Sequence, residues 1–211
     1  MHRLVFYIIL FHFSFAFGQV KNNGLITFKK VGILYNEAKQ NNFLFTDRDY
    51  NYKTNLLKFQ FFYQLNNNNN WRMNLVAQPQ IQSIKHQLLN EYFITPEDVN
   101  YEYYREKFTQ KKHISLYAFE LGLQVSKWVY KNLSFEAMLG LGAGYIDVET
   151  ERLARGFTFI ENISLGLAHS LKNSEIYVGS NFGHISNLNI KLPNSGYNIL
   201  GFEIGYRIFI Q

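Results

Sequence analysis

The chain has 211 residues, no cysteine, 18% aromatic residues, 18% charged residues and a formal net charge of +5. An aromatic-rich, charge-poor composition excludes an intrinsically disordered chain, since such chains lack aromatics and carry much charge. The absence of cysteine excludes disulfide scaffolds, thiolate metal sites and cysteine nucleophiles. The mild positive charge favours anionic partners without choosing among them.

Residues 1–18 have the pattern of a secretory signal peptide. A short basic start containing Arg3 precedes an apolar run, which ends at the small-x-small site Ala16-Phe17-Gly18. The run is shorter than the roughly 20 residues that a transmembrane helix needs. We therefore predict a signal peptide over residues 1–18 and one domain over residues 19–211.

The rest of the chain alternates between apolar and polar residues with a period of two, which is typical of half-buried strands. In residues 57–65, for example, Leu57 and Phe59 alternate with Lys58 and Gln60. We predict eight strands, at residues 25–35, 57–65, 71–82, 117–125, 133–145, 162–168, 176–182 and 200–210.

Strand and loop lengths favour a membrane barrel over a soluble sandwich. About 9–11 tilted residues cross a bilayer. Alternate connections are short, at residues 66–70, 127–132 and 171–174. Three of the other four are longer, and these four are residues 36–53, 84–112, 149–155 and 187–197. Short periplasmic turns and longer external loops are typical of outer-membrane barrels. We therefore predict an all-β fold, an eight-stranded antiparallel transmembrane β-barrel of the outer membrane.

The face opposite the apolar one carries small, amide and charged side chains, which can fill the inside of a narrow barrel. The charged residues expected to pair there are Lys58, Arg72, Glu120, Glu136, Glu203 and Arg207. Glu203 is expected to pair with Arg207. His86, His113 and His169 are scattered without metal-ligand spacing, so we expect no metal site.

The longest loop, residues 84–112, interleaves Tyr101, Tyr103 and Tyr104 with basic residues such as Arg105. Such a mixture can bind single-stranded nucleic acid. Five acidic residues balance five basic ones within the loop. We therefore expect a solvated loop and no nucleic-acid partner.

A candidate hydrolase site lies at the end of the seventh predicted strand. His184 and Ser186 are two residues apart, so they share one face of a strand, about 6.6 Å apart at Cα. A histidine can take the proton of a serine hydroxyl as its oxygen attacks an ester carbonyl. The pair has the parity of the apolar residues Val178 and Phe182. We therefore expect it to face lipid near the external membrane interface.

Three asparagines can complete this site. Asn198 begins the last strand with outward parity, so it can hydrogen-bond the histidine ring and hold its tautomer. Asn187 and Asn194 can supply amide donors for an oxyanion hole. Gly196 would help to fix the loop that carries Asn194.

The whole pattern, H-x-S-N-x5-P-N-x-G-x-N over residues 184–198, resembles that of the lipid A 3-O-deacylase (PagL-type) family of outer-membrane enzymes, also labelled acyloxyacyl hydrolases. Members are eight-stranded barrels that hydrolyse the ester-linked acyl chain at the 3-position of lipid A without a metal cofactor. The resemblance implies His184 and Ser186 as the catalytic pair, and Asn187 and Asn194 as oxyanion residues. It implies lipid A, or lipopolysaccharide, as substrate and no cofactor; a homodimer stays an open alternative.

One position departs from the family pattern, because the third catalytic residue is typically Glu where Asn198 stands here. An amide can orient a histidine ring but cannot offset the charge of an imidazolium. Our first hypothesis is a serine esterase acting on lipid A. The alternatives are a non-catalytic structural or adhesive barrel, in which Asn198 marks a lost function, and a small-solute channel or a soluble lipid-binding barrel. Glu203 is the nearest carboxylate in sequence, but its parity points it into the lumen.

Overall fold

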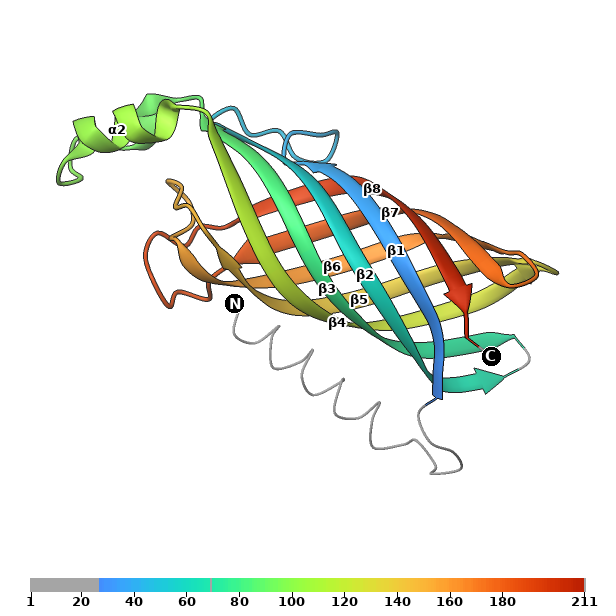
Figure 1. Ribbon diagram of the computed structural model, residues 1–211. Helices are drawn as coiled ribbons and strands as arrows, with labels where there is room; N and C mark the ends of the chain where they lie inside the picture. The colour runs from blue at the N-terminus through green and yellow to red at the C-terminus, as the bar shows by residue number, and fades with distance from the viewer. Residues whose placement is uncertain (1–26, 69, 211) are drawn as a thin grey trace.

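The computed structural model describes residues 27–68 and 70–210, which form a closed ring of eight antiparallel strands (Figure 1). The strands are β1 (Thr27–Lys39), β2 (Tyr50–Asn68), β3 (Trp71–Leu88), β4 (Lys112–Tyr130), β5 (Leu133–Ile146), β6 (Gly156–Ser170), β7 (Ser174–Ser186) and β8 (Tyr197–Phe209). The predicted fold is confirmed. The predicted signal peptide, residues 1–18, lies outside the described residues. In the described part of the chain, no helix has the length and apolar character to cross a membrane.

Several strands are longer than the alternation predicts. Residues 66–70 were expected to form a turn, yet Asn67 pairs with Arg72 and Asn68 with Trp71 in the β2–β3 hairpin. Backbone pairing continues there although both faces are polar, so the period of two is lost before the strand ends. The short turns lie at one end of the barrel and the long loops at the other (Figure 1).

The connection between β3 and β4 was expected to be entirely loop, but it is partly helical. It contains the elements η1 (Glu91–Phe93) and α2 (Tyr101–Thr109). The Arg105 guanidinium donates to the Ile94 carbonyl at 3.0 and 2.8 Å. It also lies 5.0 Å from the ring centres of Tyr92 and Tyr101. The aromatic and basic residues of this segment thus contact one another and give it a fixed shape.

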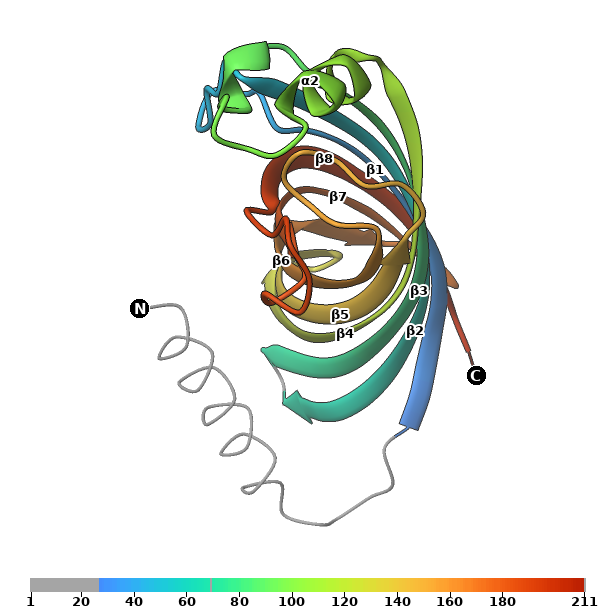
Figure 2. The ribbon, with the colours of Figure 1, turned by 90° about the vertical axis from the view of Figure 1, so that its left-hand side faces the viewer.

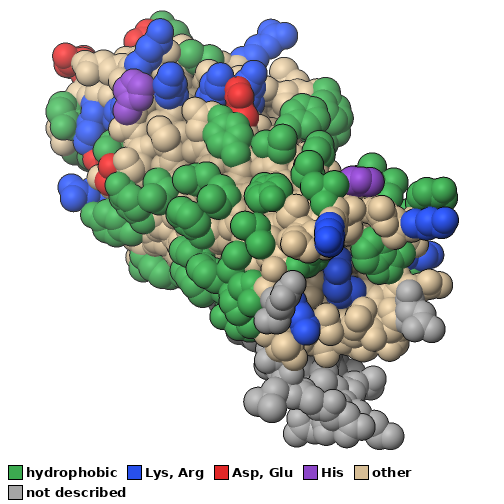
Figure 3. Space-filling model, turned by 45° about the vertical axis from the view of Figure 1, so that its right-hand side comes forward, with side chains coloured by type: hydrophobic (Ala, Val, Ile, Leu, Met, Phe, Trp, Pro, Cys, Tyr) green, Lys and Arg blue, Asp and Glu red, His purple; other side chains and the backbone are tan. Residues whose placement is uncertain are grey.

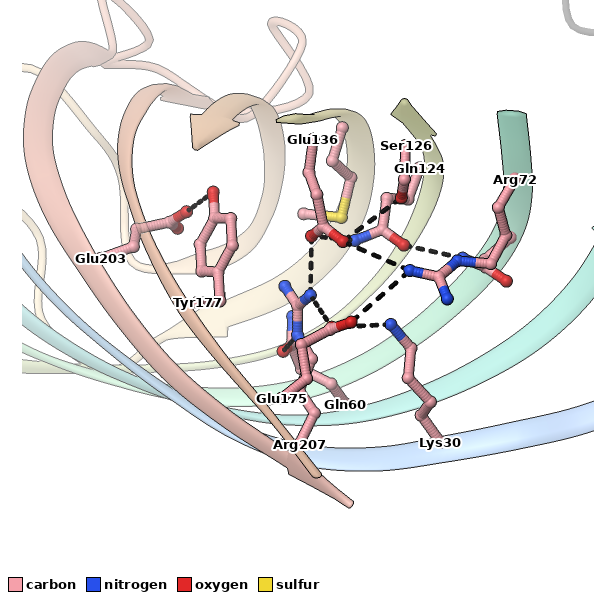
Figure 4. A network of polar contacts seen from close by, with 12 residues as sticks. Lys30, Gln60, Arg72, Gln124, Ser126, Glu136, Glu175, Tyr177, Glu203 and Arg207 are labelled. Atoms are coloured by element: carbon pink, nitrogen blue, oxygen red, sulfur yellow. Dashed lines mark hydrogen bonds and ion pairs between the residues drawn. The ribbon is translucent and has the colours of Figure 1, made fainter. Parts of the chain in front are cut away.

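Paired charges fill the lumen near the short turns (Figure 4). Arg207 donates to Glu136 at 2.6 Å and to Glu175 at 2.8 Å, and all three side chains are at most 2% exposed. Lys30 donates to Glu175 at 2.8 Å. The predicted pairing of lumen charges is therefore confirmed for Arg207 with Glu136 and for Lys58 with Glu120, which lie 2.9 Å apart. Lys30 and Glu175 join the network without having been predicted.

Glu203 faces the lumen as predicted, but its partner differs from the expected one. It accepts a hydrogen bond from the Tyr177 hydroxyl at 3.2 Å, and no ion pair joins it to Arg207 (Figure 4). Arg207 is instead engaged by carboxylates on β5 and β7. The cavity left beside Tyr177 has a volume of only about 10 Å³. That volume holds at most one water molecule, so this part of the lumen is plugged.

Toward the long loops the lumen contains a large apolar cluster, next to buried polar groups such as His86 and Glu151, which are hydrogen-bonded at 3.0 Å. Ile185 of β7 and Tyr197 and Ile199 of β8 point inward and join a buried cluster with Tyr52 and Ile160. The rings of Tyr52 and Tyr197 stack with centres 3.9 Å apart. These inward positions are apolar where the alternation predicts small or polar side chains. The cluster supports the outer ends of β7 and β8 from inside.

The outward faces of the strands form an apolar belt. Figure 3 shows hydrophobic side chains across the middle of the molecule, with Lys and Arg side chains toward its two ends. Ile33, Phe119, Leu165 and Ile204, from four different strands, are each about half exposed. Exposed apolar surface of this extent is typical of a barrel whose outer wall meets hydrocarbon.

Candidate functional site

β7 and β8 bring His184 and Asn198 together at their outer ends. The two residues are partners in the β7–β8 ladder, and His184 Nδ1 lies 2.7 Å from Asn198 Oδ1. Because an amide oxygen can only accept a hydrogen bond, Nδ1 carries the proton and Nε2 of the neutral ring keeps its lone pair. The bond therefore holds the ring in the tautomer whose Nε2 can act as a base.

Ser186 is the last residue of β7 and shares the outward parity of His184. Its partner in the β6–β7 ladder is Phe159, and the residue is 9% exposed. The structure shows no hydrogen bond between the Ser186 hydroxyl and the His184 ring. Contacts of this kind are often long until substrate binds. The two side chains thus lie on one face of one strand, with the expected spacing.

Amide hydrogen bonds hold the β7–β8 loop, residues 187–196, in one shape. Asn194 Oδ1 accepts from the backbone N–H of Asn187 at 2.5 Å, and Asn194 Nδ2 donates to Asn189 Oδ1 at 2.9 Å. The side-chain amide of Asn187 donates to the carbonyl of Lys191 at 2.7 Å. Asn187 and Asn194 are therefore neighbours next to Ser186. Asn194 keeps a second amide hydrogen that this network does not use.

The β5–β6 loop, residues 147–155, holds the β7–β8 loop from the side (Figure 2). Leu153 and Asn194 form a β-bridge. The backbone N–H of Gly196 donates to the Arg152 carbonyl at 3.1 Å, and Arg152 Nε donates to the Gly196 carbonyl at 2.7 Å. Sequence analysis did not find this contact, because nothing in residues 147–155 marks them as neighbours of the site.

A second residue missed by sequence analysis is Glu161 of β6, the ladder partner of His184 on the side away from β8. It is exposed on the outward face. Only the register between β6 and β7 shows that Glu161 lies next to His184, and the sequence alone does not give that register. Within residues 27–68 and 70–210, no cluster of three or more His, Asp or Glu side chains is placed to hold a metal ion.

An eight-stranded antiparallel barrel with an apolar outer belt and a filled polar lumen defines an outer-membrane β-barrel. The chain belongs to the lipid A 3-O-deacylase (PagL) family, whose model matches residues 49–207. The predicted family and the predicted outer-membrane location are both confirmed.

Among the solved structures that match, the first one described here has the same fold. The crystal structure of the outer membrane enzyme PagL matches with a TM-score of 0.55 and 15% identity, covering 86% of this chain and 99% of that one. Neisserial surface protein A gives a TM-score of 0.45 at 10% identity, covering 87% and 96% of the two chains. The outer membrane protease OmpT from Escherichia coli gives 0.38 at 9% identity, covering 90% and 100%. No curated protein sequence matches the chain.

Proposed function

We propose that this protein is an outer-membrane serine esterase that removes the ester-linked acyl chain at the 3-position of lipid A. The observation that carries the proposal is the 2.7 Å bond between His184 and Asn198 on the lipid-facing side, next to Ser186. Membership of the lipid A 3-O-deacylase family supports the choice of substrate. Residues 1–18 would deliver the barrel as a cleaved signal peptide.

The proposed reaction has two steps that use the same histidine. His184 Nε2 takes the proton of Ser186 Oγ while that oxygen attacks the ester carbonyl carbon. The imidazolium then returns the proton to the sugar oxygen, the ester C–O bond breaks, and the acyl chain stays on Ser186. Water attacks this acyl ester with His184 again as base, which releases the fatty acid and restores the serine.

The oxyanion that forms in each step needs hydrogen-bond donors. Asn194 is the better placed of the two asparagines predicted for this role, because its amide retains one hydrogen without a partner in the loop. The amide of Asn187 donates to the carbonyls of Lys191 and Pro193, at 2.7 and 3.5 Å. Asn187 would have to exchange one of these bonds to donate to the oxyanion as well.

The position of the site suits a substrate that arrives from the membrane. His184 and Ser186 continue the outward row of β7 beyond Val178 and Phe182. The β7–β8 loop that follows Ser186 carries Ile190 and Leu192, which are 66% and 80% exposed. Apolar side chains around an outward-facing site allow an acyl chain to approach sideways, within the outer leaflet, without passing through the plugged lumen.

Mass spectrometry of lipid A from cells that express the wild type or Ser186→Ala tests the proposal. We expect the wild type alone to remove the mass of one hydroxyacyl chain. Unchanged lipid A, in the presence of a folded and inserted wild-type barrel, would instead support the non-catalytic barrel. In that case Asn198 would mark a site that has lost its activity.

Replacing Gly196 by Ala should lower the rate of ester hydrolysis at least about tenfold. Gly196 has φ of +63°, and an added Cβ would lie 2.5 Å from the Ile185 carbonyl oxygen and 3.2 Å from Ser186 Cβ. The left-handed conformation alone costs a non-glycine residue about 1–2 kcal/mol. The loop must therefore move away from the serine, and lipid A turnover by the purified barrel measures the effect.

Gly156→Ala is the matched control for this prediction. Gly156 also has positive φ, +125°, but an added Cβ there meets nothing within 4 Å. The control therefore strains the backbone without crowding the site, and its turnover should stay close to the wild-type value. Equal turnover by Gly196→Ala and the wild type would contradict the proposed role of the loop.

A further inference from the structure

The β6–β7–β8 ladder places Glu161, His184 and Asn198 in one row on the outward face. Directly paired residues of antiparallel strands have Cβ atoms about 4.5–5.5 Å apart. The His184 ring therefore has an amide on its β8 side, bonded to Nδ1, and a carboxylate on its β6 side.

Glu161 is an unusual residue for its position. It lies between Phe159 and Ile163 on the outward row of β6, and its partner on β5 is Leu141. A carboxylate that faces hydrocarbon is costly and is commonly a functional residue. A carboxylate at this position is explained most simply if it stabilises a neighbouring group.

The only other acidic residue on the outward faces of the described strands is Glu37 of β1. Glu37 has a cation, Lys53, whose Nζ lies 3.0 Å from its carboxylate. Glu161 has neither a hydrogen bond nor an ion pair with any of the residues that the structure describes. The titratable group that the sheet places next to it is the imidazole of His184, which is a cation only when protonated.

No other charged side chain occupies the sheet positions around this pair. The outward residues that surround Glu161 and His184 on β5, β6, β7 and β8 are Leu141, Phe159, Ile163, Phe182, Ser186, Asn198 and Leu200. Among the loop cations, Arg152 is the one bonded next to the site, and it donates to the Gly196 carbonyl. Its guanidinium carbon lies 4.4 Å from the ring centre of Tyr50.

We propose that Glu161 is a positioning residue for the esterase reaction, which supplies from β6 the negative charge that Asn198 cannot supply from β8. This inference rests on the proposed function. During each step His184 becomes an imidazolium, and Asn198 can orient the ring without offsetting its charge. A carboxylate on the residue directly paired with the histidine, with the Cβ atoms about 5 Å apart, stabilises that cation, and the low dielectric of the membrane interface strengthens the attraction. Orientation and charge compensation, usually combined in one acid, are divided here between two strands.

Kinetics of the purified barrel with lipid A in detergent micelles test this division. Glu161→Gln, which keeps the shape and removes the charge, should lower kcat about 10- to 100-fold with KM unchanged. Adding Asn198→Glu to that variant should restore kcat to within about threefold of the wild type, because the charge then comes from β8. Glu37→Gln, which removes the other outward carboxylate, should leave kcat unchanged.

Three kinetic outcomes would overturn the proposal. An unchanged kcat in Glu161→Gln would show that the charge is not used. A raised KM with unchanged kcat would make Glu161 a substrate-binding residue. A lowered kcat that Asn198→Glu fails to restore would show that Glu161 acts through its place in β6 and not through its charge.

Phosphonylation of Ser186 by a fluorophosphonate needs no lipid A and therefore separates this proposal from the proposed function. The reaction requires a base that takes the serine proton, so it forms the same imidazolium. We expect Glu161→Gln to slow the labelling of Ser186, and Asn198→Glu in that variant to restore it. If the wild type leaves lipid A intact, slowed labelling still supports the charge coupling, and an unchanged labelling rate overturns it.

Discussion

Replacing Ser186 by Ala should lower kcat for lipid A hydrolysis by on the order of 10⁴-fold or more, while the barrel stays folded. The loss is large because the next hydroxyl on the outward face of β7, that of Ser180, is four residues from His184 and cannot replace Ser186. Folding should change little, since the Ser186 hydroxyl makes no hydrogen bond that would be lost. Turnover measures the first effect, and the heat-modified gel mobility of the barrel measures the second.

Ser180→Ala is the matched control, because Ser180 lies on the same strand and the same face. Its hydroxyl donates to the Gly201 carbonyl at 3.0 Å, away from the site. This variant should hydrolyse lipid A at the wild-type rate. Hydrolysis by Ser186→Ala at a rate similar to that of Ser180→Ala would rule out Ser186 as the nucleophile.

Replacing Arg207 by Met should lower the free energy of unfolding by about 3–5 kcal/mol. The Arg207 guanidinium donates to Glu136 at 2.6 Å and to Glu175 at 2.8 Å, and the arginine side chain is 2% exposed (Figure 4). Methionine fills the volume but leaves both carboxylates short of a counter-charge inside the barrel. Urea titration of the barrel in lipid vesicles, followed by tryptophan fluorescence, gives the change in stability.

Lys53→Met is the control for this second prediction. It removes an ion pair with Glu37 at 3.0 Å, in which both side chains are 44% exposed. Exposed pairs contribute only about 0–1 kcal/mol, so this variant should unfold at nearly the same urea concentration as the wild type. An Arg207→Met barrel as stable as the Lys53→Met barrel would show that the lumen network does not contribute the expected free energy of unfolding.

The fold could be predicted from strand parity together with the lengths of the strands and loops, and the outward placement of the site from parity alone. Residues at even spacing share a face, so His184 and Ser186 follow from Val178 and Phe182 without knowledge of the partner strands. The bond between His184 and Asn198 could be predicted for a similar reason, since one hairpin joins their strands.

Features that depend on register or on loop contacts could not be predicted. Glu161 lies more than 20 residues from His184 in sequence, and only the pairing of β6 with β7 makes them neighbours. The contacts of Arg152 and Leu153 with the β7–β8 loop join two segments that share no pattern. The apolar layer around Ile185 escaped detection because its residues occupy lumen-facing positions, where the alternation predicts small or polar side chains.

Covalent labelling of the folded barrel with a long-chain fluorophosphonate tests the serine-esterase assignment most directly. The reagent phosphonylates a serine whose hydroxyl is activated by a base, and peptide mass spectrometry identifies the modified residue. We expect modification of Ser186 in the wild type and its loss in His184→Gln. A wild-type barrel that stays unmodified at Ser186, or that is labelled equally in His184→Gln, would contradict the assignment.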